Sequence, residues 1–314
     1  MPSRAWLTTA LADRPRLGHP DSTIHPIQYT EEKRTIMRHR SLAAIGLAAV
    51  ASLGLAACGG GSTSSSDASA SSSDVVTLTV GATPSPHAKI LTYINDNLAA
   101  AEGIKLDIVE YTDYIQPNTA LNDGDLDANF YQTVPYLENA EKQFGFDFEA
   151  GEGIHLEPLG VFSNKHKSLD ELPDGGTIGI ISDTANQARA LKLLATQGLV
   201  SIPEGDGDVN INTVTKLKNF NFREVEGPQL VRSLDDFDYA VINGNFAQEG
   251  GKSISGDALV VESPVDNPAV NVLVWKKDSK KTDAIAKLEK LLHSDQVKQY
   301  IEQTWSDGSV IPAF

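Results

Sequence analysis

Cysteine is nearly absent from this sequence of 314 residues, and methionine is almost as rare, with two residues. The single cysteine is Cys58, so the chain has no second thiol with which to form an internal disulfide. The apolar run at residues 41–55 spans 15 residues, whereas a membrane-spanning helix needs about 20. These absences argue against a disulfide scaffold and against a spanning helix.

Motifs of several enzyme classes are also missing from the sequence. There is no Gly-x-Ser-x-Gly elbow, no phosphate-binding GxxxxGK[ST] loop and no HExxH zinc motif. The four histidines beyond residue 74 lie far apart in the sequence, at positions 87, 155, 166 and 293. We therefore expect no catalytic residue, no cofactor and no metal site.

Positive charge is scarce in most of the chain. Residues 1–57 hold 7 of the 26 basic and 4 of the 42 acidic residues, which leaves a formal charge of −19 for the remainder. Nucleic-acid binding needs a basic face for the phosphates, so we expect no nucleic-acid partner. The same charge disfavours lying flat on anionic lipid.

The segment around Cys58 has the order of a secretory signal. Arg38 and Arg40 precede the apolar run, and the run ends in small residues. The stretch Leu55-Ala-Ala-Cys58 resembles the bacterial lipobox, which implies a diacylglycerol on the Cys58 sulfur and cleavage just before it. We expect a signal peptide at 37–57 and a lipid anchor that holds the protein at the extracytoplasmic face of a bacterial cell membrane.

The segments on either side of this signal have a different character. Residues 59–74 are almost entirely Gly, Ser, Ala and Asp, so residues 58–74 are expected to be the lipidated cysteine and a flexible tether. Residues 1–36 fit no part of a signal, and Met37 stands where one would begin. We expect residues 1–36 to be an upstream extension outside the translated protein, the alternative being a genuine leader.

From residue 75 onward, strand patterns alternate with helix patterns, which predicts an α/β fold with mostly parallel sheets. The late elements have no sheet of their own, so we expect two lobes joined by crossing strands, with a ligand cleft between them. Lobe 1 is expected at 75–162 and 266–314, and lobe 2 at 163–265. The expected strands are 75–82, 105–112, 126–130, 154–164, 177–182, 221–227, 239–244, 258–263 and 270–277, and the expected helices are 87–100, 118–122, 134–144, 184–198, 283–294 and 295–305.

Three groups of residues lie where such a cleft would be. Asn186 and Arg189 share one face of the first turns of a helix, where an arginine can hold a carboxylate, although an ordinary solvent-facing arginine fits equally well. Asn243 follows a strand and offers an amide, unless it serves only a turn. Tyr114, Phe130 and Tyr131 lie just past two strands, as an apolar wall or as core. Together they suit a ligand with a carboxylate, an amine and an apolar side chain, which is an amino acid.

The order of several longer stretches carries a family resemblance. VGATPSPHA, EYTDYIQPNTALNDGDLDANFYQ, VPYLE, KSLDELPDGGTIGI, SDTANQARAL, VEGPQL, AVINGNFA and VIPAF occur in this order. The chain resembles the methionine-binding lipoprotein family (NlpA type), the solute receptors of methionine ABC importers. This resemblance implies a two-lobed periplasmic-binding-protein fold, no catalysis, and a permease and an ATPase as partners.

The resemblance also implies roles for individual residues. Arg189 matches the arginine that holds the ligand carboxylate, and Asn186 and Asn243 match polar residues around the amino-acid backbone. Tyr114 and the pair Phe130 and Tyr131 match the aromatic side of the pocket. One position departs from the family, because Thr133 stands where a histidine usually borders the side chain.

L-methionine is therefore the leading ligand expected from the sequence. Because threonine is smaller than histidine, another apolar amino acid or a methionine-containing dipeptide remains open. An enzyme on the same scaffold would need a nucleophile with its base, and the sequence lacks such a pair. An adhesin without a small ligand would not need the set of Asn186, Arg189 and Asn243.

Overall fold

The computed structural model describes residues 75–205 and 207–314. The expected signal peptide, Cys58 and the tether lie outside the described residues. Within the described part, the expected strands and helices are present with ends displaced by a few residues, except that the expected strand at 154–164 forms two short strands. No helix in this part of the chain is both long and apolar enough to cross a membrane.

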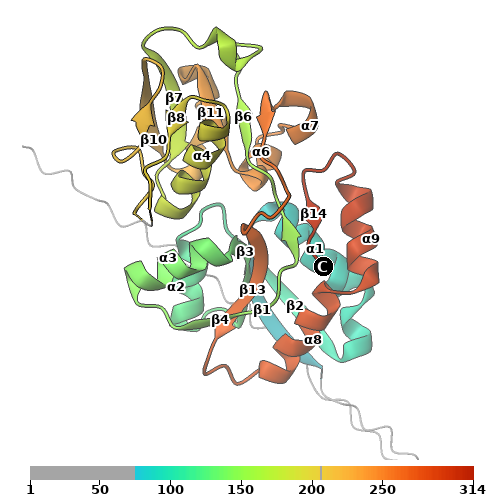
Figure 1. The fold of residues 1–314 in the computed structure, drawn as a ribbon. Helices are drawn as coiled ribbons and strands as arrows, with labels where there is room; N and C mark the ends of the chain where they lie inside the picture. The colour runs from blue at the N-terminus through green and yellow to red at the C-terminus, as the bar shows by residue number, and fades with distance from the viewer. Residues whose placement is uncertain (1–74, 206) are drawn as a thin grey trace, which may run out of the picture. The chain divides into compact units, whose positions relative to one another are not determined.

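The described strands form two larger sheets and one two-stranded ribbon (Figure 1). The first sheet has the order β14-β5-β13-β3-β1-β2, with β4 also paired to β13. Its strands are β1 (Val76–Ala82), β2 (Ile104–Glu110), β3 (Ala128–Thr133), β4 (Phe148–Ala150), β5 (His155–Leu156), β13 (Val270–Lys276) and β14 (Ile311–Pro312).

The second sheet has the order β10-β7-β11-β6-β12. Its strands are β6 (Gly160–Phe162), β7 (Gly176–Ile181), β10 (Phe220–Val225), β11 (Tyr239–Ile242) and β12 (Val260–Val261), and the ribbon pairs β8 (Val200–Ser201) with β9 (Thr215–Lys216). The α/β fold class is confirmed. Both sheets are mixed rather than mostly parallel, because the strands that cross between them pair antiparallel with β11 and β3.

Two segments cross between the sheets, and they decide where the site lies. The stretch at 154–164, expected as one long strand, contributes β5 to the first sheet and β6 to the second. The chain returns between β12 and β13, which pairs antiparallel with β3. The lobe boundaries at 162 and 265 stay a prediction.

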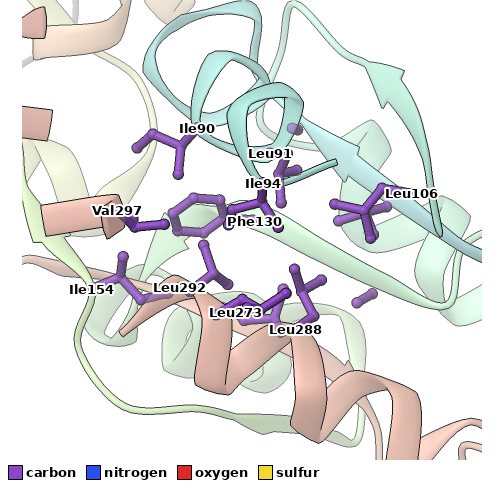
Figure 2. Packing of buried hydrophobic residues seen from close by; sticks show 14 of the residues in the cluster. Ile90, Leu91, Ile94, Leu106, Phe130, Ile154, Leu273, Leu288, Leu292 and Val297 are labelled. Atoms are coloured by element: carbon purple, nitrogen blue, oxygen red, sulfur yellow. The ribbon is translucent and has the colours of Figure 1, made fainter. Parts of the chain in front are cut away.

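Apolar helix faces cover the first sheet and form its core (Figure 2). Helix α1 (Lys89–Asn97) buries Ile90, Leu91 and Ile94, a spacing that places them on one face. Leu288 of α8 (Thr282–Leu292) and Val297 of α9 (Asp295–Thr304) join the same cluster. Fully burying one such side chain stabilises the fold by roughly 1.5–3 kcal/mol. This core therefore stabilises the first sheet, and with it the position of the end of β3.

The remaining helices follow strand ends or line the second sheet. They are α2 (Gln116–Asp123), α3 (Val134–Phe144), α4 (Thr184–Thr196), α5 (Gly227–Arg232), α6 (Gly244–Glu249) and α7 (Ile254–Asp257). Four of these helices begin with at most two residues between them and a preceding strand: α3 after β3, α4 after β7, α5 after β10 and α6 after β11. The junctions at α3, α4 and α6 supply most of the candidate site.

Candidate functional site

One small cavity lies where the three strand–helix junctions meet. Its lining comes from both sheets: Tyr114, Tyr131, Gln132, Thr133, Tyr136, Glu157, Asn186, Arg189, Asn243, Gly244, Asn245 and Asn271. Because β7 and β11 run parallel, their carboxyl ends lie at the same edge of the second sheet, where α/β folds place ligands. Six of the seven expected ligand-binding residues line this cavity, and their part in binding stays a prediction.

Asn186 is held in place from two sides. Asp183 is the N-cap of α4, and its Oδ1 accepts hydrogen bonds from the backbone N–H of Asn186 at 2.8 Å and from its Nδ2 at 3.1 Å. The Oδ1 of Asn186 in turn accepts a hydrogen bond from Nδ2 of Asn243 at 2.9 Å. Burial raises the pKa of Asp183 to about 6, although the hydrogen bonds from Asn186 act in the opposite direction. The two amides therefore form one oriented pair.

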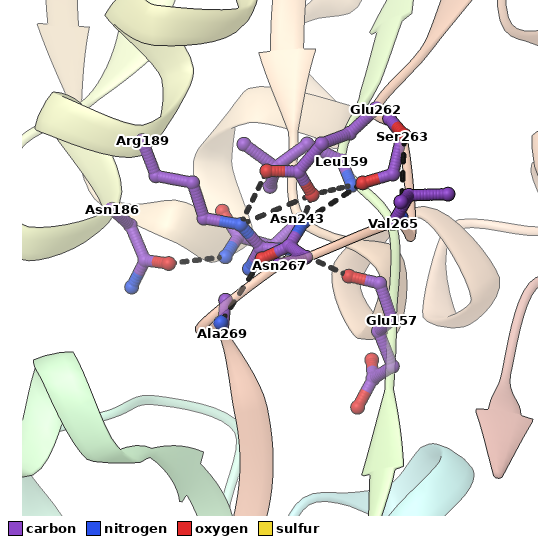
Figure 3. Close-up of polar contacts among 10 residues, drawn as sticks. All are labelled: Glu157, Leu159, Asn186, Arg189, Asn243, Glu262, Ser263, Val265, Asn267 and Ala269. Atoms are coloured by element: carbon purple, nitrogen blue, oxygen red, sulfur yellow. Dashed lines mark hydrogen bonds and ion pairs between the residues drawn. The ribbon is translucent and has the colours of Figure 1, made fainter. Parts of the chain in front are cut away.

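Arg189 is paired inside the protein rather than free (Figure 3). Its Nε donates to both carboxylate oxygens of Glu262, at 2.9 and 3.1 Å, and its Nη2 donates to Oε2 of Glu262 at 2.5 Å. Nη2 also donates to the backbone oxygen of Glu157 at 2.7 Å. The side chain is 14% exposed, so it lies in the cleft and not in bulk solvent.

Glu262 was not expected at the site from the sequence. It lies in the segment that returns to the first sheet, 73 residues after Arg189. Its backbone N–H donates to the oxygen of Leu159, and its Oε2 accepts from the N–H of Leu159, so the two crossing segments are tied together beside the guanidinium. The positive charge of Arg189 is thus already offset by a carboxylate of the chain itself.

The opposite wall of the cavity is aromatic. The hydroxyl groups of Tyr131 and Tyr136 both donate to the backbone oxygen of Tyr114, each at 2.8 Å. The hydroxyl of Tyr114 donates to Oδ1 of Asn245 at 2.5 Å, and its ring stacks on Phe246 at 4.7 Å. Burial raises the pKa of Tyr114 well above its usual value, so the phenol stays neutral. This wall is uncharged and is held together by hydrogen bonds and ring stacking.

Phe130, which was expected to contact the ligand, does not line the cavity. Successive side chains of a strand point to opposite faces, so Tyr131 faces the cavity and Phe130 points into the core of the first sheet. Phe130 is fully buried there (Figure 2). Its ring packs edge-on against His87, with the ring centroids 4.8 Å apart. Thr133 does line the cavity, and its Oγ1 accepts the N-capping hydrogen bond of α3 from the N–H of Tyr136.

Glu157 is the second acidic residue that was missed, and it brings two histidines together. Its Oε1 lies 2.9 Å from Nε2 of His155 and 3.3 Å from Nε2 of His87. Burial lowers the pKa of His87 to about 4 and that of His155 to about 3, so both rings are neutral at pH 7. Burial also raises the pKa of Glu157.

These three side chains offer ligand atoms that all lie within 4.8 Å of one another, in contrast to the scatter of the histidines along the sequence. The imidazole contacts with Glu157, Asn271 and Thr83 pair three of the four ring nitrogens through hydrogen bonds. The one local signal was the alternation His155-x-Glu157, which puts both side chains on the same face of an extended segment.

Gly244 explains how Glu157 comes so close to the start of α6. A Cβ atom at this position would lie 2.9 Å from the Cβ of Glu157, closer than such atoms approach in proteins. The sequence Asn243-Gly244-Asn245 therefore starts the helix and, through its glycine, leaves room for the side chain of Glu157. Asn245, two positions after Asn243, was weighed from the sequence as a turn residue, and it also lines the cavity.

The cavity is small, but it opens into a larger space. It encloses about 20 Å³, room for about one water molecule. An adjoining groove of about 880 Å³ shares Thr133, Asn186 and Arg189 with the cavity lining. The cavity with its paired arginine, amides and tyrosines provides polar groups for a small zwitterion and a neutral wall for its side chain.

Fold and site together define a class of protein. The fold is that of the periplasmic substrate-binding proteins of ABC transporters, which bind solutes and are not enzymes. Residues 78–314 match the family described as NlpA lipoprotein, and the chain belongs to this family.

Known relatives cover nearly the whole described part of the chain. A crystallised lipoprotein of Actinomyces odontolyticus is 94% identical, with a TM-score of 0.76, over 77% of this chain and 100% of its own. A nutrient-binding protein of Burkholderia cenocepacia, solved bound to methionine, is 32% identical, with a TM-score of 0.70, over 76% and 100%. A protein of Pasteurella multocida named probable D-methionine-binding lipoprotein MetQ is 34% identical over 74% of this chain and 85% of its own.

Proposed function

We propose that this protein captures L-methionine in the cavity between the tyrosine wall and the Arg189 wall and delivers it to an ABC importer. The observation that carries the proposal is the meeting of Arg189, Asn186 and Asn243 with Tyr114 and Tyr131 in one cavity. A relative that binds methionine at 32% identity supports the same ligand class. The permease and the ATPase of the importer are the partners that this function requires.

Each part of L-methionine has a counterpart in the lining. The carboxylate accepts hydrogen bonds from the guanidinium of Arg189, whose internal bonds use Nε and Nη2. The ammonium group lies toward Glu157 and the amide oxygens of the asparagines. The thioether packs on the tyrosine rings, a contact worth roughly 0.3–1.5 kcal/mol for each sulfur–aromatic pair.

Ligand entry requires the walls to part. L-methionine is larger than a cavity of about 20 Å³, so the lobes open to admit it and close around it, and closure reports occupancy to the permease. We assign these lobes to residues 75–162 with 266–314, and to residues 163–265. Another apolar amino acid is the second candidate, because Thr133 leaves space where the family carries a histidine.

The anchoring part of the proposal concerns residues outside the described structure. Proteins of this family are lipoproteins, and we assign the lipid to Cys58, at the extracytoplasmic face of the membrane. Metabolic labelling with radioactive palmitate tests this assignment in cells that express the full chain. Wild type is expected to incorporate label and Cys58→Ala to lose it, and equal labelling of both would overturn the assignment.

Titration calorimetry tests the ligand. The protein from residue 75 onward is suitable, because the 94% identical relative was crystallised as a chain of corresponding extent. L-methionine is expected to bind, and Arg189→Ala to weaken binding by about two to four decades, since removing one partner of a buried charge costs about 3–5 kcal/mol. Arg223→Ala, at an exposed arginine of β10, is the matched control and should bind as wild type does.

The expected ligand can fail independently of the site. If L-leucine and not L-methionine binds and Arg189→Ala abolishes it, the ligand assignment is wrong and the site stands. If Arg189→Ala binds L-methionine as wild type does while its thermal unfolding is unchanged, Arg189 is not in the site.

A further inference from the structure

Helix α6 also contacts the first sheet's part of the molecule outside the cavity, through the side chain of Gln248. Its Oε1 accepts a hydrogen bond from Oγ of Ser85 at 2.9 Å and another from Nε1 of Trp305 at 2.9 Å. Ser85 lies between β1 and α1, and Trp305 directly follows α9. None of these three residues lines the cavity. Gln248 therefore joins a helix of the second sheet to two separate segments of the first.

The partners of Gln248 determine which way its amide points. An indole nitrogen can only donate a hydrogen bond, so the amide oxygen and not the amide nitrogen faces Trp305. Trp305 packs in the core cluster of the first sheet, and Ser85 is buried as well. A side chain at position 248 that accepted no hydrogen bond would leave both buried donors without a partner in this arrangement, at a cost in free energy.

The nitrogen of the same amide has no partner. Nε2 of Gln248 is buried, and no acceptor lies within hydrogen-bond distance of it in the described part of the chain. A buried donor without an acceptor destabilises the arrangement that buries it. Water can reach this group once α6 moves away from Ser85 and Trp305. The contact thus holds α6 with two hydrogen bonds, and the unpaired nitrogen limits how strongly it does so.

Gln248 lies one helical turn beyond the cavity lining. Helix α6 begins with Gly244 and Asn245, which line the cavity, and Gln248 follows Asn245 by three residues, a rise of about 4.5 Å. Backbone hydrogen bonds such as the one from the N–H of Ala247 to the oxygen of Asn243 join the two ends of the helix. The contact at Gln248 therefore sets how closely Asn243 and Asn245 approach the tyrosine wall.

We propose that Gln248 is a positioning residue for ligand capture, which holds α6 against Ser85 and Trp305 when the protein closes and so keeps the cavity shut around the ligand. It does not touch the ligand. Opening breaks both hydrogen bonds, whereas the first encounter of the ligand with the open protein does not involve them. The contact therefore slows release of the ligand and leaves its association rate unchanged. This inference rests on the proposed function of the cavity.

Stopped-flow fluorescence with L-methionine tests the inference on variants of the chain from residue 75 onward. Gln248→Met keeps the length of the side chain and is at most a weak acceptor, so it should raise the dissociation rate about three- to tenfold and leave the association rate within about twofold. Gln248→Glu keeps an acceptor for both donors and should release L-methionine within about twofold of the wild-type rate. Gln229→Met, at an exposed glutamine of α5, is the matched control and should change neither rate.

A double-mutant cycle tests the contact itself. Ser85→Ala removes one of the two donors, so it should raise the dissociation rate by less than Gln248→Met does. The double variant of Ser85→Ala with Gln248→Met should release L-methionine within about twofold of Gln248→Met alone, because both changes remove the same contact. Effects that multiply in full would overturn the coupling of Ser85 to Gln248.

Hydrogen–deuterium exchange without ligand separates this inference from the proposed function. The backbone amides of residues 243–250 should exchange faster in Gln248→Met than in wild type. If L-methionine does not bind wild type and this difference in exchange remains, the proposed function fails and the contact stands. If wild type binds L-methionine and Gln248→Met releases it at the wild-type rate, or Gln248→Glu releases it as fast as Gln248→Met, the inference is overturned and the proposed function remains.

Discussion

The two walls of the cavity are built on the same backbone plan and differ in chemistry. On one wall, β3 leads into α3 at Thr133, and three tyrosines are joined through the oxygen of Tyr114. On the other wall, β7 leads into α4 at Asp183, and Arg189 is paired with Glu262. The tyrosine wall carries no charge, whereas the Arg189 wall holds a guanidinium that is paired with a carboxylate. We therefore expect the first wall to select a ligand by shape and the second to select it by charge.

The residues that cap the two helices, Asp183 and Thr133, differ in whether they can ionise. Asp183 caps α4 as a buried acid whose folded-state pKa is about 6, above the usual value of about 3.9, while Thr133 caps α3 without titrating. Between these two pH values the folded chain holds a proton on Asp183 that the unfolded chain has released, so this residue makes stability fall as pH rises from about 4 to about 6.

Asp183→Asn should therefore gain stability relative to wild type as pH rises. The difference in free energy of unfolding is expected to increase by about 1.5–3 kcal/mol between pH 4 and pH 7, because asparagine caps a helix as well as aspartate does and does not ionise. Urea unfolding at both pH values measures it. Thr133→Ser is the control on the other wall, and a pH-independent difference for Asp183→Asn would contradict the account.

The Asn243 amide should matter most among the neutral groups of the Arg189 wall. Asn243→Ala removes an amide that we propose contacts the ligand, and it leaves Oδ1 of Asn186 without its 2.9 Å donor. We expect L-methionine to bind about 10–100-fold more weakly, which corresponds to about 1.4–2.8 kcal/mol. Calorimetry compares it with Asn221→Ala, an exposed residue of β10, and equal affinities would remove Asn243 from the site.

Glu262→Gln should change affinity in the opposite direction. It keeps the shape beside Arg189 and removes the internal negative charge, so a ligand carboxylate meets an uncompensated guanidinium. Free L-methionine is expected to bind about three- to tenfold more tightly. Unchanged or weaker binding, measured by calorimetry on a variant with normal thermal unfolding, would show that Glu262 does not oppose the ligand carboxylate.

The tyrosine wall should give the smallest effect. Tyr131→Leu removes a ring that faces the cavity, and L-methionine is expected to bind about two- to tenfold more weakly, as the loss of a sulfur–aromatic contact predicts. Tyr131→Phe keeps the ring, and Tyr136 still donates to the oxygen of Tyr114. This second variant should bind within about twofold of wild type, and a larger loss would assign the hydroxyl, not the ring, to binding.

Local patterns sufficed for the parts of the site that follow strand ends. Asn186, Arg189 and Asn243 were expected there because strand and helix periodicities locate the junctions, and the structure brings them together. Phe130 and Tyr131 show the limit of such patterns, since adjacent strand residues face opposite sides and a shift of one residue exchanges them. The sequence alone did not decide which of the two faced the cavity.

The acidic residues of the site could not be found in this way. Glu157 and Glu262 lie on the two segments that cross between the sheets. Glu157 meets His87, and Glu262 meets Arg189, only through the tertiary fold. His87 comes 70 residues before Glu157, and Arg189 comes 73 residues before Glu262, so local sequence spacing predicts neither contact. The fold class was predictable from alternation, and the pairing of buried charges was not.

The claim that one small amino acid is held against Arg189 can be tested most directly by native mass spectrometry. Wild type and Arg189→Ala are purified from residue 75 onward without added ligand and compared before and after denaturation. Wild type should carry one bound molecule with the mass of methionine, and the variant should carry none. A wild-type protein that stays empty even after L-methionine is added, or a variant that carries as much as wild type, would contradict the account.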